Sequence, residues 1–283
     1  MTAGPRSCGS ASNSTPPVSP TTAGSRLEII GVGLVAGFLS GLFGVGGGIL
    51  IVPSLVLILH MAQRLAHGTS LAAIVPIAVA GVIGFALEDA VDWAVAGLLI
   101  VGAAAGAVVG TRLLAILPAR ALGFIFTGAL LATAIRLVFD QSDATGRGDL
   151  TVAGGLGLVA IGMLSGVLAG LLGVGGGIIM VPAMVLLYSI PGAVAKGTSL
   201  AVIIPTAVVG TVRNLHAHNA DLQTAALVGL SGMVSSFAAS KISIGLDDRL
   251  SNILFAGLLV LTSLRTLVTH LRRPADPPAS LAD

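Results

Sequence analysis

Charged residues are scarce in this chain. Of its 283 residues only 9% are Asp, Glu, Lys or Arg, whereas 55% are hydrophobic and the mean hydropathy is +1.02. A soluble domain carries about 25% charged residues, so this chain lacks the charge to cover a surface that faces water. Residues 150–195 contain no charged side chain and no histidine over 46 positions, although a membrane-spanning helix needs only about 20. The composition excludes a soluble protein and predicts several membrane-spanning segments.

The sequence also has few of the residues that catalysis, disulfide formation or metal binding require. Cys8 is the only cysteine, which excludes an intramolecular disulfide and a cysteine-based metal site. No Asp or Glu occupies the interior of an apolar segment, and no set of Ser, His and Asp suited to catalysis lies within one. The pair His216 and His218 is by itself a weak metal motif. We therefore expect no enzymatic activity, no cofactor and no metal site.

The apolar segments predict helices and not the strands of a membrane barrel. Barrel strands alternate apolar and polar residues over about 10 positions, whereas these segments are apolar on every side. The 39 glycines suit helices that pack closely in lipid. The 14 Lys and Arg residues form no run that would indicate nucleic-acid binding. We expect an all-α polytopic membrane protein that contacts the lipid bilayer and not nucleic acid.

The chain contains two copies of one pattern at a constant offset. The run Gly-Leu-Phe-Gly-Val-Gly-Gly-Gly-Ile from Gly41 recurs, with one change, from Gly170, and Gly-Thr-Ser-Leu-Ala from Gly68 recurs from Gly197. Across residues 41–81, 23 of the 41 positions are identical without a gap. Such self-similarity indicates a duplicated unit. The predicted organisation is a disordered tail (1–26), a first repeat (27–139), a polar linker (140–150), a second repeat (151–271) and a C-terminal tail (272–283).

Each half contains about five hydrophobic helical segments, because Gly-Val-Gly-Gly-Gly breaks its first apolar stretch in two. The stretches are 27–59, 66–86, 93–111 and 121–138, then 151–189, 196–213, 222–239 and 250–268. If each broken stretch is a hairpin that returns to its own side, a half crosses the membrane an odd net number of times and the repeat is inverted.

The distribution of basic residues bears on this topology. With a cytoplasmic N-terminus, an inverted repeat places nine of the 14 Lys and Arg on the cytoplasmic side, and a parallel repeat places six there. The equivalent basic pairs Arg112/Lys241 and Arg120/Arg249 favour the parallel arrangement. We predict inverted repeats with both termini cytoplasmic.

The two glycine motifs are the strongest functional signal. Three successive glycines interrupt a helix, and an interruption at membrane depth is tolerated only where it lines a cavity or is buried in protein. The helix that restarts after it would direct its free N–H groups at a bound anion, and paired breaks in two halves are typical of a transporter's central site. The alternative is a tight turn used only for packing. The candidate substrate-binding glycines are Gly44, Gly46, Gly47, Gly48, Gly173, Gly175, Gly176 and Gly177.

The two Gly-Thr-Ser motifs add hydroxyl groups to this site. Thr69 and Ser70, with their equivalents Thr198 and Ser199, open apolar segments. They are either helix N-caps or donors to the oxygens of a small anion, and the two roles are compatible. We include all four as candidate substrate-binding residues.

His67 and Lys196 occupy equivalent positions directly before these motifs. They are candidate charge partners of the substrate, or else anchors at the membrane interface. A site of N–H groups, hydroxyls and cations, with no carboxylate, favours a small anionic substrate.

The duplicated Gly-Leu-x-Gly-Val-Gly-Gly-Gly-Ile-x-x-Val-Pro and Gly-Thr-Ser-Leu-Ala-x-Ile-x-Pro motifs, together with the chain length, resemble the TauE/SafE family of bacterial sulfite and organosulfonate exporters. The resemblance covers about residues 27–271. It implies a permease of the bacterial cytoplasmic membrane that moves small sulfur-containing anions, usually outward. Alternatives are a permease for another small solute or a metal ion, and a membrane assembly factor without transport. The glycine stripes suit packing within one chain or against a neighbouring copy, so a homo-oligomer stays open.

Overall fold

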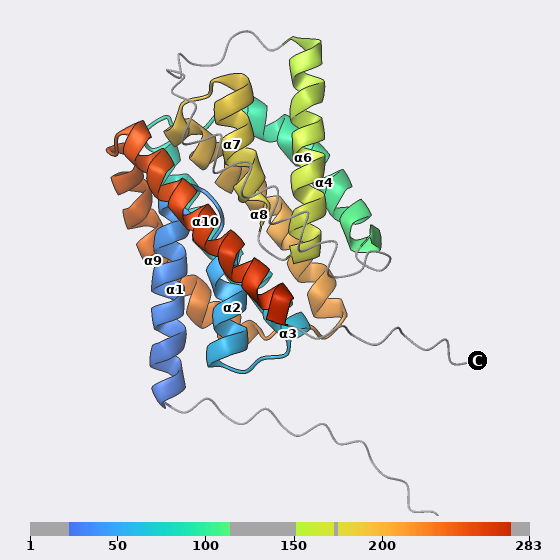
Figure 1. Ribbon diagram of the computed structural model, residues 1–283, viewed down its shortest axis with the longest axis vertical. Helices are drawn as coiled ribbons and strands as arrows, with labels where there is room; N and C mark the ends of the chain where they lie inside the picture. Colours follow the sequence, from blue (N-terminus) through green and yellow to red (C-terminus); the bar gives the residue numbers. More distant parts are fainter. Residues whose placement is uncertain (1–22, 114–150, 173–174, 273–283) are drawn as a thin grey trace, which may run out of the picture.

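The protein is helical throughout the residues that its computed structural model describes, which are 23–113, 151–172 and 175–272. No strand occurs in these ranges, which confirms the all-α prediction. The helices, labelled as in Figure 1, are α1 (Ala23–Phe43), α2 (Gly48–Ile58), α3 (Gln63–Ala86), α4 (Trp93–Leu113), α6 (Val152–Leu172), α7 (Gly177–Tyr188), α8 (Gly192–His216), α9 (Leu222–Ile244) and α10 (Asp248–Arg272).

Several predicted segments lie outside the described residues. They are most of both tails, the linker 140–150, and the apolar stretch 121–138. At the N-terminal end α1 begins at Ala23, ahead of the boundary drawn at residue 27.

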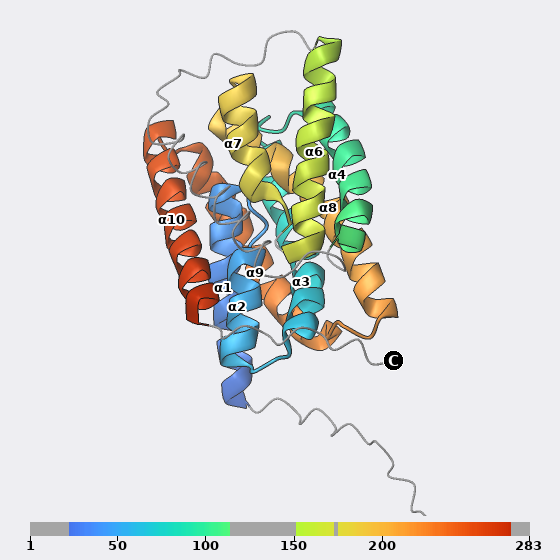
Figure 2. The ribbon, with the colours of Figure 1, turned by 45° about the vertical axis from the view of Figure 1, so that its right-hand side comes forward.

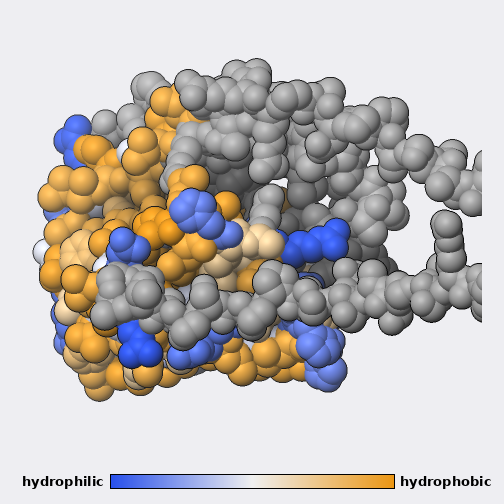
Figure 3. Space-filling view, turned by 90° about the horizontal axis from the view of Figure 1, so that it is seen from below, coloured by the Kyte–Doolittle hydropathy of each residue, from blue (hydrophilic) through white to orange (hydrophobic). Residues whose placement is uncertain are grey.

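Five of the described helices are long and apolar enough to cross a membrane, namely α1, α3, α6, α8 and α9. Large apolar side chains such as Leu27, Val152 and Leu261 are exposed on the outside of the molecule. Figure 3 shows hydrophobic residues over much of the described surface seen from below, with separate hydrophilic patches between them. In water such a surface would be unstable, whereas in lipid tails it is the favourable one. The fold is therefore that of a multi-pass membrane protein.

A short helix turns back beside a long one at two places in the chain. In Figures 1 and 2, α1 begins at the lower end of the molecule and α2 ends there, whereas α6 begins and α7 ends at the upper end. Helix α1 ends at Phe43 and α2 begins at Gly48, and α7 begins at Gly177 after α6 has ended at Leu172. Glycine allows each reversal because it adopts left-handed backbone angles without a Cβ clash.

Close helix packing follows from small residues. A Cβ added at Gly37 of α1 would overlap the carbonyl oxygen of Gly232 on α9, and one at Gly106 of α4 would overlap that of Met163 on α6. Such contacts let the backbones of membrane helices approach one another. Gly102 and Gly106 of α4 thus serve packing against α6.

Helices α3 and α8 form the centre of the molecule and run antiparallel. Each is 67% buried over its membrane-length window, more than the other spans. Gly68, near the start of α3, packs against Asn219, which follows the end of α8. Gly197, near the start of α8, packs against Ala90, which follows the end of α3. The two helices therefore place their Gly-Thr-Ser motifs toward opposite ends of the molecule.

Candidate functional site

The two glycine turns contact each other inside the protein. A Cβ built at Gly177 would lie 2.6 Å from the Gly44 carbonyl oxygen and 2.9 Å from the Val45 Cα. One built at Gly175 would lie 3.6 Å from the Val45 carbonyl oxygen. All residues from 41 to 49 and from 175 to 178 are buried. Two segments that carry the same glycine motif and lie far apart in the sequence thus meet at one place.

Glycine is required in these turns by the backbone conformation. The φ angles are +72° at Gly44, +82° at Gly46 and +72° at Gly47, and +86° at Gly175 and +76° at Gly176. An L side chain in this left-handed region costs about 1–2 kcal/mol. Gly48 and Gly177 are the first residues of α2 and α7. Gly173 lies outside the described residues.

Helices α2 and α7 begin at the two turns, so their first N–H groups lie near the contact between the turns. The backbone bonds that close α2 and α7 begin at Leu50 and Ile179, which donate to the oxygens of Gly47 and Gly176 at 3.0 and 3.3 Å. The N–H groups that precede Leu50 and Ile179 in each helix have no acceptor within that helix. Together with the positive end of each helix dipole, they are suited to an anion.

Ser70 and Ser199 bring two hydroxyl groups into the same interior. Both are fully buried, and no described residue gives either Oγ a hydrogen-bond partner. The Ser199 Oγ lies 2.8 Å from the position of a Cβ on Gly177, directly at the start of α7. A buried hydroxyl without a partner is costly, so its retention is typical of a group that a ligand satisfies.

Ser40 and Ser236 are two further residues of this kind, and sequence reasoning missed them. Each is 0% exposed with its Oγ unpartnered among the described residues. Ser40 lies beside Gly47, because a Cβ added at Gly47 would be 3.5 Å from the Ser40 Cβ. Ser236 lies beside Gly81 of α3, because a Cβ added at Gly81 would be 2.9 Å from the Ser236 Oγ. Nothing in the sequence distinguishes them from serines that bond to their own helix, such as Ser231. Only the packing identifies them.

Thr69 and Thr198 do not cap helices, so that interpretation is wrong. Helix α3 begins at Gln63 and α8 at Gly192, which places both threonines inside a helix. The physical reason is that each helix begins earlier than predicted, α3 over residues 63–65 and α8 over residues 192–195 directly after Pro191. Thr69 Oγ1 instead accepts a hydrogen bond from the backbone N–H of Asp221 at 3.0 Å, and Thr198 Oγ1 accepts one from that of Asp92 at 2.9 Å.

Lys196 is 3% exposed, so it is not an anchor at the membrane interface. Its Nζ donates to Ser243 Oγ at 2.9 Å and to Ser251 Oγ at 2.5 Å, and Ser243 Oγ donates to the Leu42 carbonyl oxygen at 2.8 Å. Its backbone lies against the first turn, 2.6 Å from the position of a Cβ on Gly44. The Lys196 amino group is thereby connected through Ser243 to Leu42, close to the end of α1 and the first glycine turn.

His67, the equivalent of Lys196, is only partly buried. The two positions thus differ in exposure as well as in residue type.

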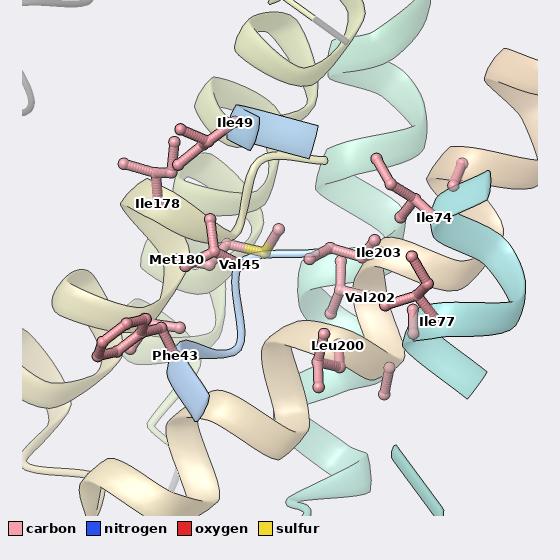
Figure 4. Close-up of a cluster of buried hydrophobic side chains, with 14 of the residues drawn as sticks. Phe43, Val45, Ile49, Ile74, Ile77, Ile178, Met180, Leu200, Val202 and Ile203 are labelled. Carbon is pink, nitrogen blue, oxygen red and sulfur yellow. The ribbon is translucent and has the colours of Figure 1, made fainter. Parts of the chain in front are cut away.

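Apolar side chains cover the turns in this conformation. A Cβ on Gly46 would lie 3.2 Å from Ile203 and 3.5 Å from Ile74, and Gly175 also faces Ile203 at 3.3 Å. Figure 4 shows these isoleucines in one cluster with Val45, and with Met180 of α7. Among the described residues, the turns are therefore in contact with apolar side chains of α3 and α8.

Comparison with known proteins gives a consistent result. The family model described as "Sulfite exporter TauE/SafE" matches residues 29–266. The chain is 28% identical over 215 residues to Probable membrane transporter protein YunE of Bacillus subtilis, covering 68% of this chain and 78% of that protein. It is 24% identical over 253 residues to YjnA of the same organism, also named a probable membrane transporter protein, covering 85% and 99%. A shorter match, 40% identical over 82 residues, is to a probable membrane transporter protein of Xylella fastidiosa, covering 29% and 31%.

Proposed function

Because this chain belongs to the sulfite exporter TauE/SafE family of membrane transporters, we propose that it exports a small sulfur-containing anion across the bacterial cytoplasmic membrane. Sulfite and organosulfonates are the proposed substrates. The observation that carries the proposal is the contact between the two glycine turns, where the starts of α2 and α7 and the hydroxyl of Ser199 come together.

The residues around the turns suit an oxyanion. Backbone N–H groups of Gly46, Gly47 and Gly48 at one turn, and of Gly175, Gly176 and Gly177 at the other, would donate to its oxygens. Ser70 and Ser199, which are buried without a partner among the described residues, would add two hydroxyl donors. Thr69 and Thr198 would add more, because a hydroxyl that accepts one hydrogen bond can still donate another.

Ser40 and Ser236 extend the proposed site on the sides of α1 and α9, for the same reason as the other two serines. Lys196 would supply positive charge beside the turns, with His67 as its counterpart in the other half. The interiors of the apolar segments carry no carboxylate, so an anion would meet no like charge on its way through the protein.

We further propose that the halves 27–139 and 151–271 are inverted repeats built around this site. Backbone positions with positive φ support the duplication, since among the described residues the four non-glycine examples form two pairs at the offset of the repeat: His60 with Ser189, and Asp89 with His218. The antiparallel course of the equivalent helices α3 and α8 supports inversion, as do the opposite directions of α1 and α6 in Figures 1 and 2. Both termini would then lie on the cytoplasmic side.

The experiment is flux of radiolabelled sulfite in proteoliposomes that contain the purified chain, with and without an imposed pH gradient or membrane potential. We expect saturable flux above that of empty liposomes, with competition by sulfonates. Flux that changes with the gradient would identify the driving ion or voltage.

Two results would contradict the proposal. One is the absence of sulfite flux together with no competition or binding by a panel of sulfonates. The other is a chain that binds divalent metal ions but not sulfite, which would indicate a metal permease. Turnover of substrate by detergent-solubilised protein, where no compartments exist, would instead indicate a membrane enzyme.

A further inference from the structure

Two hydrogen bonds connect the halves of the chain in a reciprocal way. The hydroxyl of Thr69 on α3 accepts from the backbone N–H of Asp221, and the hydroxyl of Thr198 on α8 accepts from that of Asp92. Thr69 and Thr198 are equivalent positions of the two repeats, and so are Asp92 and Asp221. Each motif therefore bonds to the loop of the opposite half.

The glycine before each threonine lets the helix backbone approach the same loop closely. A Cβ on Gly68 would overlap the Asn219 carbonyl oxygen, and a Cβ on Gly197 would overlap that of Ala90. These two carbonyls belong to the same loops as the two aspartates. Each Gly-Thr pair thus docks a helix backbone onto one loop through a close approach and a hydrogen bond.

The docked loops hold the starts of two helices. Asp92 Oδ1 accepts from the N–H groups of Ala94 and Val95 at the start of α4. Asp221 Oδ1 accepts from those of Gln223 and Thr224 at the start of α9. Movement of either loop away from its threonine would carry the start of α4 or of α9 with it.

The two docking contacts lie at opposite ends of the molecule. Asp221 precedes α9, and Lys241 near the other end of α9 forms an ion pair with Glu88, in the loop that also contains Asp92, at 2.6 Å. Twenty helical residues span about 30 Å, which is the thickness of the hydrocarbon core of a bilayer. The hydrogen bond of Thr69 therefore lies toward the end of the molecule at which α1 begins (Figure 1), and that of Thr198 lies toward the opposite end.

The neighbour of each threonine belongs to the central site. Ser70 and Ser199 follow Thr69 and Thr198 directly, and both are fully buried with an Oγ that has no partner among the described residues. Each motif thus connects the glycine turns at the centre to a loop at one end. Ile74 and Ile203 lie against the glycine turns in the structure, in which both threonine contacts are formed.

We propose that Thr69 and Thr198 are latches that each close one end of the transport pathway, and that transport breaks them alternately. The proposal rests on the proposed transport function, but its test requires no substrate. Loss of the Thr69 contact opens only the end at which α1 begins, and loss of the Thr198 contact opens only the other end.

The test measures thiol labelling at two buried reporter positions. Cys8 is replaced by Ser, which removes the only native cysteine, and a cysteine is placed either by Ala66→Cys or by Ala195→Cys. Both alanines are 0% exposed and lie three residues before Thr69 and Thr198 on the same helix face. The full chain is reconstituted in lipid nanodiscs, where a hydrophilic maleimide reaches both faces.

Thr69→Val should raise the labelling rate at position 66 by about fivefold, as expected for the loss of one neutral hydrogen bond, and leave position 195 unchanged. Thr198→Val should do the converse. Thr→Ser at either site keeps the acceptor and should restore the rates of the parent chain. Thr206→Val is the matched control, because Thr206 Oγ1 donates only to Val202 and Ile203 of its own helix, at 3.2 and 2.9 Å.

Equal increases at both positions would overturn the proposal, because they indicate general loosening. Unchanged rates at both positions would overturn it as well. If a Thr→Val variant yields no folded protein, Thr→Ala removes the same acceptor and must give the same end-specific pattern. Absence of sulfite flux would count against the proposed substrate and would leave this labelling result intact.

Discussion

At the residue scale, the proposed site combines glycines whose left-handed backbone disfavours a side chain with serines whose hydroxyls have no hydrogen-bond partner among the described residues. The sequence singles out the glycines as candidates, because three in succession have few uses in a membrane helix. It also singles out Ser70 and Ser199 as candidates, because their motif occurs twice. It could not select Ser40 or Ser236, since a hydroxyl bonded to its own helix and one that lacks a partner look alike in a sequence.

Replacement of Gly47 tests the conformation of the first turn. Gly47→Ala places a Cβ at φ +72° and 2.8 Å from the Ala36 carbonyl oxygen. We expect a loss of about 1–2 kcal/mol of stability and the loss of most sulfite flux, because the start of α2 must shift. Thermal unfolding in detergent and proteoliposome flux measure the two effects.

Gly257→Ala is the control for this experiment. Gly257 lies on α10 with open space around its Cβ position, so alanine there should leave flux unchanged and stability equal or slightly higher. Equal flux from the Gly47→Ala and Gly257→Ala proteins would contradict the role of the turn.

At the scale of elements, apolar segments predicted helices well because lipid leaves the backbone few other choices. The stretch 93–111 is α4, Trp93–Leu113, and 222–239 lies within α9, Leu222–Ile244. The starts of α3 and α8 were placed too late, because α3 extends back over the polar residues Gln63 and Arg64, and α8 extends back over the apolar residues 192–195. The sequence could not predict which helices pack against each other, since every helix face is apolar. Which helices become neighbours depends on how small residues fit against the backbone of another helix.

The contact between α4 and α6 provides a test of such a fit. Gly106→Ala would place a Cβ on the carbonyl oxygen of Met163, which forces the two backbones apart. Overpacking of this kind costs about 1–3 kcal/mol, so the thermal midpoint should fall. Gly97→Ala on the same helix meets nothing within 4 Å and should leave the midpoint unchanged. A fall of the same size in both variants would contradict the packing account.

At the scale of the whole molecule, the sequence indicated a duplicated membrane protein and the family to which it belongs. It could not show that the two glycine turns meet, because their contact joins segments from different halves of the chain. Nor could it show the exchange of hydrogen bonds between Thr69 and Asp221 and between Thr198 and Asp92. Both features depend on how the halves pack, which a one-dimensional pattern does not contain.

The proposed inversion predicts that equivalent residues lie on opposite faces of the membrane. Leu87 and His216 are exposed and occupy equivalent positions of the two repeats. In the chain without Cys8, Leu87→Cys should react with an impermeant thiol reagent only from outside the cell, and His216→Cys only from the cytoplasmic side. Labelling of both from the same side would contradict an inverted repeat.

The central claim is that a sulfur oxyanion passes through the site formed by the two turns and their serines. The most direct measurement is the initial rate of radiolabelled sulfite flux in proteoliposomes for the parent chain and for the Ser70→Ala, Ser199→Ala double variant. Loss of hydrogen bonds to a charged ligand should lower the rate at limiting sulfite by at least about tenfold. Ser231→Ala, which removes a hydroxyl bonded only to carbonyls of its own helix, should not. Equal flux through all three proteins, or none through the parent chain, would contradict the account.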